Sequence, residues 1–500
     1  MNYNFIKVNF DLINNYYLIN NIEKYNLNNK TETYTVLEFY TDILNLKENS
    51  TFYVNDLNKF FLYVAYYLLQ SGFKNVEENL TTNTFKYSYK SGTCSNMKIK
   101  NRYNTEITLI NFHSKFGIEF ADPEQNIKLV NYALKKNRYR ISLGADAFNE
   151  FISYQLPTSR YKEFVAHKII RNNEHYPILE ELKELEEAKL YLAGYQTCKT
   201  GTFENIVEYD ISSSYASQLL NDTPVGIPKY YVNIEDVPRS YFKVINFSYW
   251  NINLKSNKIG FMQINAFGNL NLTQEMFNLF IENYQCSYKI NYVIAFKTRK
   301  HVFDSFIYDN IIKGKVEETD KIIAKYNKNI GNSIVGYFGR KTTQETTNLK
   351  LRYNKLDPEK KLKAIDPIYL PLYLCVLDKA KSSFIRTLQL VKNKIVYANT
   401  DGFYTTHKID LRLLNVGINQ PIGNYREKSK FALMQIEGIN SLSAITDSGE
   451  IVNTLSGMKT FDLITPDQHK QRDFDYYIDV PTSSGYIMRQ ILRPEKRTHQ

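Results

Sequence analysis

Short apolar runs separated by polar turns fill the first third of the chain. Residues 51–54, 106–112 and 139–143 are apolar runs of strand length. Residues 60–70 form a longer apolar stretch and predict a helix. Because strands alternate with a helix, the pattern predicts a mixed α/β domain over residues 1–165.

A helical stretch separates this domain from the rest of the chain. It has Pro177 in its first turn and Gly194 at its end, which is the usual order of these two residue types in a helix. Four apolar residues lie near one face of it: Ile178, Leu182, Leu185 and Leu190. Residues 166–204 are therefore expected to form a helical linker.

Two apolar strands in the remaining chain each lead to a carboxylate. Residues 205–209 predict a strand that ends at Asp210, and residues 392–406 predict a hairpin whose turn contains Asp401. A strand end holds a carboxylate rigidly, which suits a metal ligand. Each acid alone is equally an ordinary strand-end or turn residue.

Two polar stretches lie between these acids. Residues 320–333 predict a helix with one basic face, formed by Lys321, Lys325 and Lys328. Residues 340–363 are charged and poor in apolar side chains, so they predict a loop or hairpin outside the core.

Length and charge narrow the class of protein. The chain has 500 residues, of which 43% are hydrophobic, and this is enough for roughly two to four globular units. Its 63 Lys and Arg against 52 Asp and Glu give a net charge of +11, which favours a polyanionic partner. The densest apolar run, residues 60–69, is too short to span a bilayer, so no membrane partner is expected.

The cysteines suggest a reducing compartment. Cys94, Cys198, Cys286 and Cys375 lie far apart and form no C-x-x-C pair. Neither a zinc module nor a disulfide framework is therefore expected, and the expected location is the cytoplasm, which for a viral protein is that of the host.

The combination of these features is more specific than any one of them. Two strand-end carboxylates, a lysine-lined helix between them and a tyrosine shortly after the first acid are the parts that phosphoryl transfer needs. Such reactions use two divalent cations bridged by carboxylates, and further cations that neutralise a triphosphate.

Three motifs in order resemble those of the family B DNA polymerases, and within them the protein-primed branch that includes phage, adenovirus and linear-plasmid replicases. The first motif, Asp-x-x-Ser-x-Tyr-Pro, is matched by residues 210–215, with Ala216 in place of proline. The second, Lys followed after three residues by Asn-Ser-x-Tyr-Gly, is matched by Lys328, Asn332, Ser333 and Gly336, with Val335 in place of tyrosine. The third, Tyr-x-Asp-Thr-Asp, is matched by Tyr397, Thr400 and Asp401, with Asn399 in place of the first acid.

The resemblance implies a two-metal catalytic centre. Asp210 and Asp401 would be the catalytic carboxylates and would bind Mg²⁺, or Mn²⁺ as an alternative, with the Ile211 carbonyl as a further ligand. Asn399 removes one acid, which is expected to weaken the site without abolishing it, because an amide oxygen still coordinates or accepts a hydrogen bond.

The resemblance also implies nucleotide contacts, from Ser213, Tyr215, Lys328, Asn332 and Tyr397. Tyr215 would lie under the sugar and exclude a ribose 2′-hydroxyl, while Lys328 would contact the triphosphate. For Tyr215 and Asn332, simple packing or capping is an equally good interpretation. Lys313 and Lys315 are further candidates for contact with the triphosphate, although for either lysine alone a solvated surface position is the favoured interpretation.

The implied DNA contacts are spread over the linker, the basic helix and the polar stretch after it. They are Tyr191, Gly194, Lys325, Ser333, Gly336 and Arg340. Gly194 is equally well interpreted as a helix cap. The family's thumb motif has no clean counterpart, although Lys428 and Lys430 are candidates for it.

Residues 1–165 resemble the family's proofreading exonuclease without its acids. Asp11 is followed by Leu and Ile where the family has a glutamate two residues on, Phe60 or Phe61 stands at a second acid, and Lys136 stands at a third. The resemblance therefore implies a degenerate exonuclease domain retained for strand binding and architecture, without proofreading.

The expected fold is α+β, a right-hand polymerase with an antiparallel palm, helical fingers and a small thumb after the exonuclease-like domain. The expected divisions are 1–165 exonuclease-like, 166–204 linker, 205–300 palm and first insertion, 301–340 fingers, 341–364 second insertion, 365–428 palm, and 429–500 thumb.

The function this implies is template-directed DNA synthesis by a monomer. Its partners would be a DNA primer-template, dNTPs and, if synthesis is protein-primed, a terminal protein whose hydroxyl serves as primer. One alternative is a catalytically weak or inactive DNA-binding replication scaffold descended from a polymerase. Another is a terminal transferase or gap-filling repair polymerase.

Overall fold

The computed structural model describes most of the chain. The described residues are 2–13, 16–28, 31–77, 79–90, 93–140, 142–154, 194–262, 265–339, 343–352, 355–364, 369–416, 422–455, 476–481 and 487–492. Most of the predicted linker, residues 166–204, lies outside them. Among the described residues, no helix is long and apolar enough to cross a membrane.

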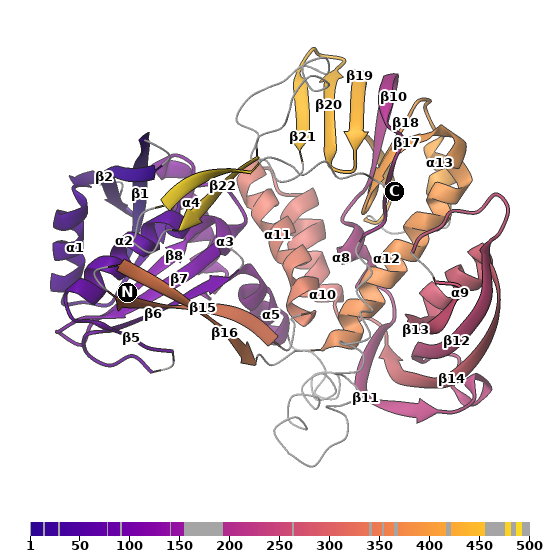
Figure 1. Ribbon diagram of the computed structural model, residues 1–500, viewed down its shortest axis with the longest axis horizontal. Coiled ribbons are helices and arrows are strands. Elements are labelled where there is room, and N and C mark those ends of the chain that lie inside the picture. Colours follow the sequence, from indigo (N-terminus) through magenta and orange to yellow (C-terminus); the bar gives the residue numbers. More distant parts are fainter. Residues whose placement is uncertain are drawn as a thin grey trace.

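The N-terminal domain, at the left of Figure 1, is a mixed sheet with helices on it. The central strands β1, β4 and β8 run parallel to one another, and the remaining pairs are mostly antiparallel. Its elements are β1 (Asn2–Ile13), β2 (Tyr16–Asn26), β3 (Thr31–Tyr34), α1 (Val36–Asn45), β4 (Ser50–Val54), α2 (Leu57–Gln70), β5 (Lys74–Asn75), β6 (Thr84–Lys90), β7 (Thr93–Lys100), β8 (Glu106–Asn111), α3 (Phe112–Phe116), α4 (Pro123–Lys135) and α5 (Leu143–Ser153).

Helix caps determine where two of these helices begin. The Asp56 side chain accepts a hydrogen bond from the Lys59 backbone N–H and so starts the apolar helix α2, as the pattern predicts. The predicted strand over residues 139–143 is wrong, because Ser142 caps α5 by accepting a hydrogen bond from the Ala145 N–H. Residue 143 therefore begins a helix.

The palm is a second, seven-stranded sheet in the order β21-β20-β19-β10-β18-β17-β9. Its strands are β9 (Gln196–Cys198), β10 (Gly201–Ile211), β17 (Ile395–Asn399), β18 (Gly402–Thr405), β19 (Tyr425–Gly438), β20 (Ser441–Thr446) and β21 (Ile451–Leu455). The same part of the chain contains four helical segments among its described residues. They are the short helices α8 (Ser214–Gln218) and α13 (Leu411–Leu414), the long helix α12 (Leu370–Val391) and the 3₁₀ turn η3 (Lys392–Lys394) that follows it. The predicted boundary between residues 428 and 429 falls inside β19, which pairs with β10 along most of its length.

An insertion with its own sheet, in the order β11-β14-β12-β13, interrupts the palm. It consists of β11 (Thr223–Tyr231), η1 (Ile234–Asp236), β12 (Phe242–Leu254), β13 (Phe267–Thr273), α9 (Gln274–Asn283) and β14 (Tyr284–Arg299). The apolar faces of α9 and the sheet pack together into a separate core.

The fingers follow the insertion and stand between the two halves of the molecule (Figure 1). They contain α10 (Asp304–Ile307), the π-helix η2 (Tyr308–Val316) and α11 (Lys321–Phe338). The predicted lysine-lined helix is α11, which Asp320 caps by accepting hydrogen bonds from the backbone N–H groups of residues 322 and 323.

Two segments of the second half return to the N-terminal domain. The predicted excursion is an antiparallel hairpin, β15 (Thr343–Arg352) and β16 (Lys355–Ala364). Leu349 of β15 is buried in the core of the N-terminal domain, and its backbone N–H donates to the Tyr87 hydroxyl at 2.6 Å. Farther on, β22 (Tyr476–Pro481) and β23 (Ile487–Leu492) join the N-terminal sheet at β2.

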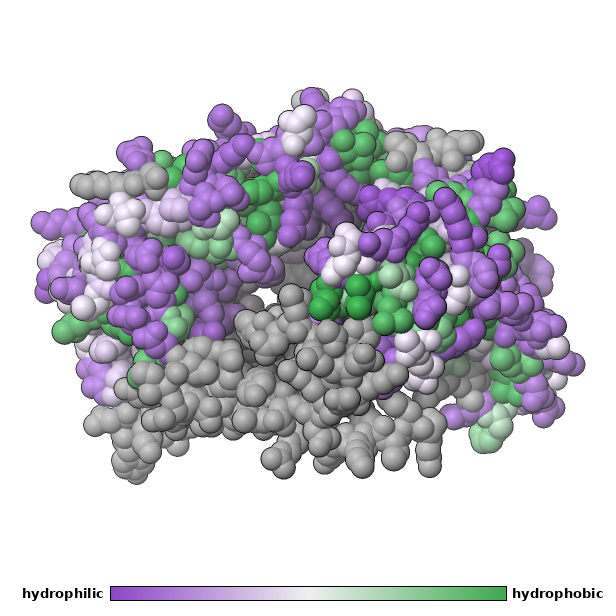
Figure 2. Space-filling view, turned by 90° about the horizontal axis from the view of Figure 1, so that it is seen from above, coloured by the Kyte–Doolittle hydropathy of each residue, from purple (hydrophilic) through white to green (hydrophobic). Residues whose placement is uncertain are grey.

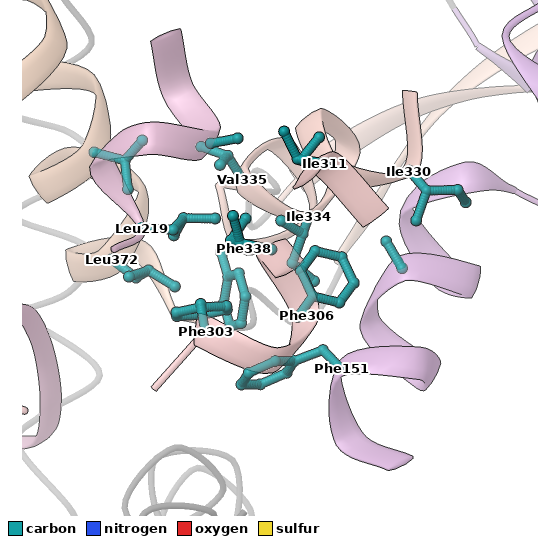
Figure 3. Close-up of a cluster of buried hydrophobic side chains, with 14 of the residues drawn as sticks. Phe151, Leu219, Phe303, Phe306, Ile311, Ile330, Ile334, Val335, Phe338 and Leu372 are labelled. Carbon is teal, nitrogen blue, oxygen red and sulfur yellow. The ribbon is translucent and has the colours of Figure 1, made fainter. Parts of the chain in front are cut away.

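One hydrophobic core joins the N-terminal domain, the fingers and the palm. Phe151 of α5 stacks on Phe303 at 4.5 Å between ring centroids, and Phe338 of α11 closes the group (Figure 3). Leu372 of α12 belongs to the same core. Outside it, hydrophilic residues cover most of the coloured surface seen from above (Figure 2).

A pair of glycines on α11 tests how tightly the fingers pack. A Cβ at Gly331 would overlap the Ile311 side chain of η2, whereas one at Gly336 would meet nothing within 4 Å. Overpacking costs about 1–3 kcal/mol, and replacing glycine by alanine in a helix gains at most about 1 kcal/mol. We expect Gly331→Ala to lower the free energy of unfolding and Gly336→Ala to raise it slightly, as measured by urea denaturation. Equal stabilities of the two variants would contradict the packing described.

Candidate active site

Asp210 and Asp401 lie side by side at one end of the palm sheet. Asp210 is the penultimate residue of β10 and lies directly opposite Gly402 of β18. The Ile211 backbone N–H donates to the Asp401 carbonyl at 3.2 Å. Gly402 is needed here, because a Cβ at this position would lie only 3.2 Å from the Tyr209 carbonyl. Both carboxylates are half-buried. The strand that carries Asp210 and the turn that carries Asp401 are thus neighbours, and the catalytic role of the two acids stays a prediction.

Strained turns hold both acids. Ser213, three residues after Asp210, has φ +54°, and Thr400, immediately before Asp401, has φ +61°. A left-handed conformation is uncommon for serine and unfavourable for β-branched threonine. Strain of this kind persists only where the surrounding structure enforces it, and it clusters at functional sites.

The two carboxylates repel each other. Burial, and next to it the negative charge of Asp210, raise the pKa of Asp401 to about 6, although Lys328 and Lys428 oppose the shift. A divalent cation bound between the acids would remove this repulsion.

Cations from three elements face the acid pair. Lys315 of η2 donates to the Ser213 hydroxyl at 2.6 Å, and Arg426 of β19 pairs with Asp210 at 3.3 Å. Burial, then the positive charges of Lys328 and Arg426, lower the pKa of Lys315 to about 8. This crowding of positive charge beside two acids suits a polyanionic ligand that brings its own cation.

Two further lysines complete this group. Lys328 is half-buried on α11, where its charge acts on both Lys315 and Asp401. Lys428 of β19 pairs with Glu208 at 2.7 Å, and Glu208 also accepts from the Tyr404 hydroxyl at 3.2 Å. Lys313 and Lys315 are the further candidates for the triphosphate. The structure brings Lys315 to the site, whereas Lys313 is exposed.

Tyr215 lies near Asp401, and Asn332 lies on the same helix as Lys328. Tyr215 is half-buried against the shared core, and burial, followed by the charge of Asp401, raises its pKa to about 12, so it stays a neutral phenol. Asn332 lies one turn after Lys328 on α11, and its buried side-chain oxygen has no hydrogen-bond partner among the described residues. An unpaired buried acceptor is costly, so a ligand at this position would relieve it.

The predicted nucleotide contact of Tyr397 is wrong for its side chain. Tyr397 is 2% exposed in a palm core, and its hydroxyl both donates to Asn440 Oδ1 at 3.2 Å and accepts from the Asn440 N–H. It secures the palm instead of facing a ligand.

Asn399, which stands where the family motif has an acid, is fully engaged in hydrogen bonds. Its side-chain oxygen accepts from Gln196 and from Thr400, each at 2.9 Å, and its amide donates to Asn440 Oδ1 at 3.0 Å. The amide oxygen thus accepts two hydrogen bonds.

The predicted DNA contacts are only partly brought together. Gly194 packs on the turn before Asp401, since a Cβ would lie 2.6 Å from the Thr400 hydroxyl. Lys325 and Gly336 are exposed on α11, and the Ser333 hydroxyl donates to the Ile330 carbonyl at 2.9 Å. Tyr191 and Arg340 lie outside the described residues.

The donor set at this site fits a hard divalent cation. Two carboxylates and nearby backbone carbonyls are the oxygen ligands that Mg²⁺ accepts. Within the described part of the chain, no group of three or more His, Cys, Asp and Glu side chains offers a metal site. A metal here would therefore depend on Asp210 and Asp401.

The acids of the N-terminal domain have other roles. Asp56 caps α2 and pairs with Lys59 at 3.2 Å, and Asp11 is exposed on β1. Whether the domain retains nuclease chemistry stays a prediction.

Arg426 was missed by sequence reasoning. It lies opposite Asp210 because β19 pairs with β10, although the two residues are 216 positions apart in the sequence. The only local signal is the alternation of basic residues at 426, 428 and 430, which is typical of one face of a strand.

Comparisons with known proteins agree with the predicted relationship. Residues 189–411 match a family model described as DNA polymerase type B, organellar and viral, and this range contains all three motifs. A DNA polymerase of Streptococcus phage Cp-1 is 24% identical over 301 residues, which cover 53% of this chain and 52% of that protein. The match thus spans about half the length of this curated relative.

Solved structures share the fold over almost the whole chain. Phi29 DNA polymerase complexed with primer-template DNA superposes with a TM-score of 0.80 at 15% identity, covering 97% of this chain and 98% of that one. Its complex with primer-template DNA and incoming nucleotides gives 0.77 at 15% identity, covering 98% and 99%. The predicted α+β right-hand fold is confirmed, and the family model agrees with the resemblance to the family B DNA polymerases.

Proposed function

We propose, on the premise that this chain is related to the family B DNA polymerases, that it is a template-directed DNA polymerase. The observation that carries this proposal is the pair Asp210, on β10, and Asp401, in the turn before β18, faced by cations of the fingers and of β19. This arrangement matches what nucleotidyl transfer needs, namely fixed carboxylates and a cationic site for a triphosphate.

The reaction joins a deoxynucleotide to a primer. The primer 3′-oxygen forms a bond to the α-phosphorus of the dNTP, the bond from that phosphorus to its bridging oxygen breaks, and pyrophosphate leaves. The proton of the hydroxyl passes to solvent. Because covalent chemistry by the protein is not required, its residues act by positioning and by charge.

Asp210, Asp401 and the carbonyl of Ile211 would hold Mg²⁺ or Mn²⁺. The cation, when bound, would stabilise the negative charge on the attacking and leaving oxygens. Lys315 and Lys328 would bind the triphosphate, with Ser213 holding the Lys315 ammonium at the edge of the site. Asn332 would meet the nascent base pair with its unpaired oxygen.

Tyr215 would select the sugar. Its position after Asp210, packed on the shared core beside the acids, supports a ring that lies under the deoxyribose and leaves no room for a 2′-hydroxyl.

The template would run between the N-terminal domain and the fingers. The hairpin β15–β16 bridges these parts, since Asn75 of the N-terminal domain donates to the Leu349 carbonyl at 3.3 Å. A closed bridge of this kind would encircle the template and favour processive synthesis. The separately folded insertion, β11 to β14, would suit a terminal protein whose hydroxyl starts synthesis.

The chain would act as a monomer in the cytoplasm of a host cell and without proofreading. The lack of a proofreading centre is supported by Phe60 and Phe61, which stand where the family has its second acid and are buried in the core of the domain.

Primer extension tests the proposal against its alternatives. We expect wild type to extend a primer on a template with Mg²⁺ or Mn²⁺, and Asp401→Asn to extend it about 1,000-fold more slowly, since a catalytic metal supplies several kcal/mol. Asp236→Asn, which changes an exposed acid of the insertion, is the matched control. DNA binding without extension by wild type would establish a scaffold instead, and extension regardless of template would establish a terminal transferase.

Sugar selection tests Tyr215. Removing a steric clash of about 1–3 kcal/mol should lower the preference for deoxyribonucleotides over ribonucleotides by about 10- to 100-fold in Tyr215→Ala. Both sugars are measured in the same extension assay, so the rate with dNTP is the internal control. An unchanged ratio would remove the role given to this ring.

The pH dependence of dNTP use tests Lys315. A pKa of about 8 means that the ammonium is charged below this pH and neutral above it, so kcat/KM for dNTP should fall above about pH 8. In Lys315→Arg the guanidinium stays charged, and the fall should move to higher pH. Identical alkaline limbs in the two proteins would show that another group is responsible.

A further inference from the structure

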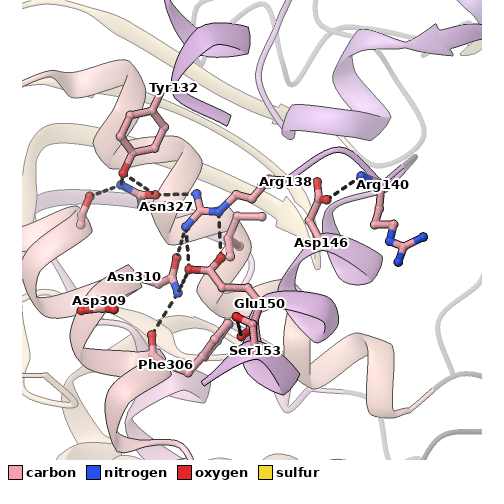
Figure 4. A network of polar contacts seen from close by, with 12 residues as sticks. Tyr132, Arg138, Arg140, Asp146, Glu150, Ser153, Phe306, Asp309, Asn310 and Asn327 are labelled. Carbon is pink, nitrogen blue, oxygen red and sulfur yellow. Dashed lines mark hydrogen bonds and ion pairs between the residues drawn. The ribbon is translucent and has the colours of Figure 1, made fainter. Parts of the chain in front are cut away.

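A buried polar cluster joins the N-terminal domain to the fingers (Figure 4). We name it the interdomain cluster, and it consists of Arg138, Glu150, Asn310 and Asn327. Arg138 is only 2% exposed, and both asparagines are fully buried. Arg138 lies between α4 and α5, and Glu150 lies on α5. Asn310 lies on η2 and Asn327 on α11.

Arg138 is bonded in both directions. Its guanidinium donates to both oxygens of Glu150, at 2.8 and 3.1 Å, which fixes its plane within the N-terminal domain. The same group donates to Asn327 Oδ1 at 2.8 Å and to Asn310 Oδ1 at 2.6 Å. The planar guanidinium thus binds one residue of η2 and one residue of α11. A lysine ammonium could not reproduce this geometry.

The cluster also ties the two fingers elements to each other. The Asn327 amide donates to the Gly314 carbonyl of η2 at 2.7 Å. Gly314 allows this approach, because a Cβ there would lie 2.9 Å from the Asn327 amide and 2.6 Å from the Asp309 carbonyl. The π-helical turn of η2 is therefore seated directly on α11.

Asn327 of the cluster, and Gly314 to which it donates, each lie one residue before a lysine of the fingers that faces the acid pair. Gly314 precedes Lys315, and Asn327 precedes Lys328. Both backbone positions are fixed by hydrogen bonds that lead back to Arg138, either directly or through Asn327. A shift of η2 along α11 would move Lys315 relative to Lys328.

We infer that Arg138 is a positioning residue for nucleotide binding, which holds η2 and α11 in the register that lets Lys315 and Lys328 bind one triphosphate. The inference rests on the proposed function and adds a role for the N-terminal domain, which serves as the foundation of the fingers. The domain then contributes to synthesis without a catalytic group of its own.

The test compares two conservative variants with a control in the same domain. Arg138→Lys keeps the charge and loses the fork, and Asn327→Leu removes the link from α11 to η2 without touching Glu150. Asn101→Ala is the control, because Asn101 is a fully buried polar residue that binds the carbonyls of Leu44 and Leu46, far from the fingers. Each protein is assayed well below its own melting temperature.

We expect Arg138→Lys and Asn327→Leu to raise KM for dNTP by about 10- to 100-fold, with a smaller change in kcat and an unchanged Kd for primer-template, because small misplacements of binding groups are costly. Asn101→Ala should lower the melting temperature and leave KM unchanged. An equal rise of KM in Asn101→Ala, or no rise in the two cluster variants, would overturn the inference.

A double variant tests whether Arg138 acts on nucleotide binding through Lys315. If Arg138 acts through Lys315, then Arg138→Lys combined with Lys315→Ala should raise KM little more than Lys315→Ala alone. Multiplied effects would show that Arg138 does not act through Lys315. Failure of wild type to extend DNA would instead refute the proposed function, so the two failures are distinguishable.

Discussion

The negative charges of Asp210 and Asp401, held side by side at the end of the palm sheet, are the constraint on which the arrangement of the surrounding elements depends. Strand pairing between β10 and β18 leaves Asp210 and Asp401 no room to separate, and their repulsion in a half-buried site is on the order of a few kcal/mol. Burial, together with the charge of Asp210, raises the pKa of Asp401 to about 6. The acids keep these positions because the strand pairing and the tight turns fix their backbone, and because the surrounding cations offset their repulsion.

The compensating cations come from elements that the palm does not contain, so the fingers must be fixed relative to the palm. Lys315 and Lys328 reach the acids from η2 and α11, and only Arg426 and Lys428 belong to the palm sheet. The core shared by Phe151, Phe303 and Phe338 gives the general placement of the fingers (Figure 3). Apolar packing alone permits small slides, whereas directional hydrogen bonds to a buried guanidinium fix one register.

Features set by neighbouring residues could be predicted from the sequence, and features set by distant pairing could not. The lysine-lined helix, the hairpin around Asp401 and the strand that ends at Asp210 all follow from local periodicity. The strand predicted over residues 139–143 failed because one capping serine outweighs a short apolar run. Arg426, the continuation of the palm past residue 428 and the interdomain cluster depend on partners more than a hundred residues away, about which local patterns say nothing. The burial of Tyr397 is of the same kind, since its partner Asn440 comes from a later turn.

The amide at position 399 follows from the same electrostatic constraint. A third acid beside Asp210 and Asp401 would add to a repulsion that already raises one pKa, and it would need a cation to balance it. In this chain the neighbours of residue 399 are matched to an amide instead: Gln196 and Thr400 donate to its oxygen, and Asn440 accepts from its nitrogen. A carboxylate could keep the first two bonds but would face the Asn440 oxygen without a donor, and that oxygen also accepts from the Tyr397 hydroxyl. The loss of the motif acid is therefore part of a consistent local structure, in which two carboxylates remain for a cation and the third position stabilises the turn that presents Asp401.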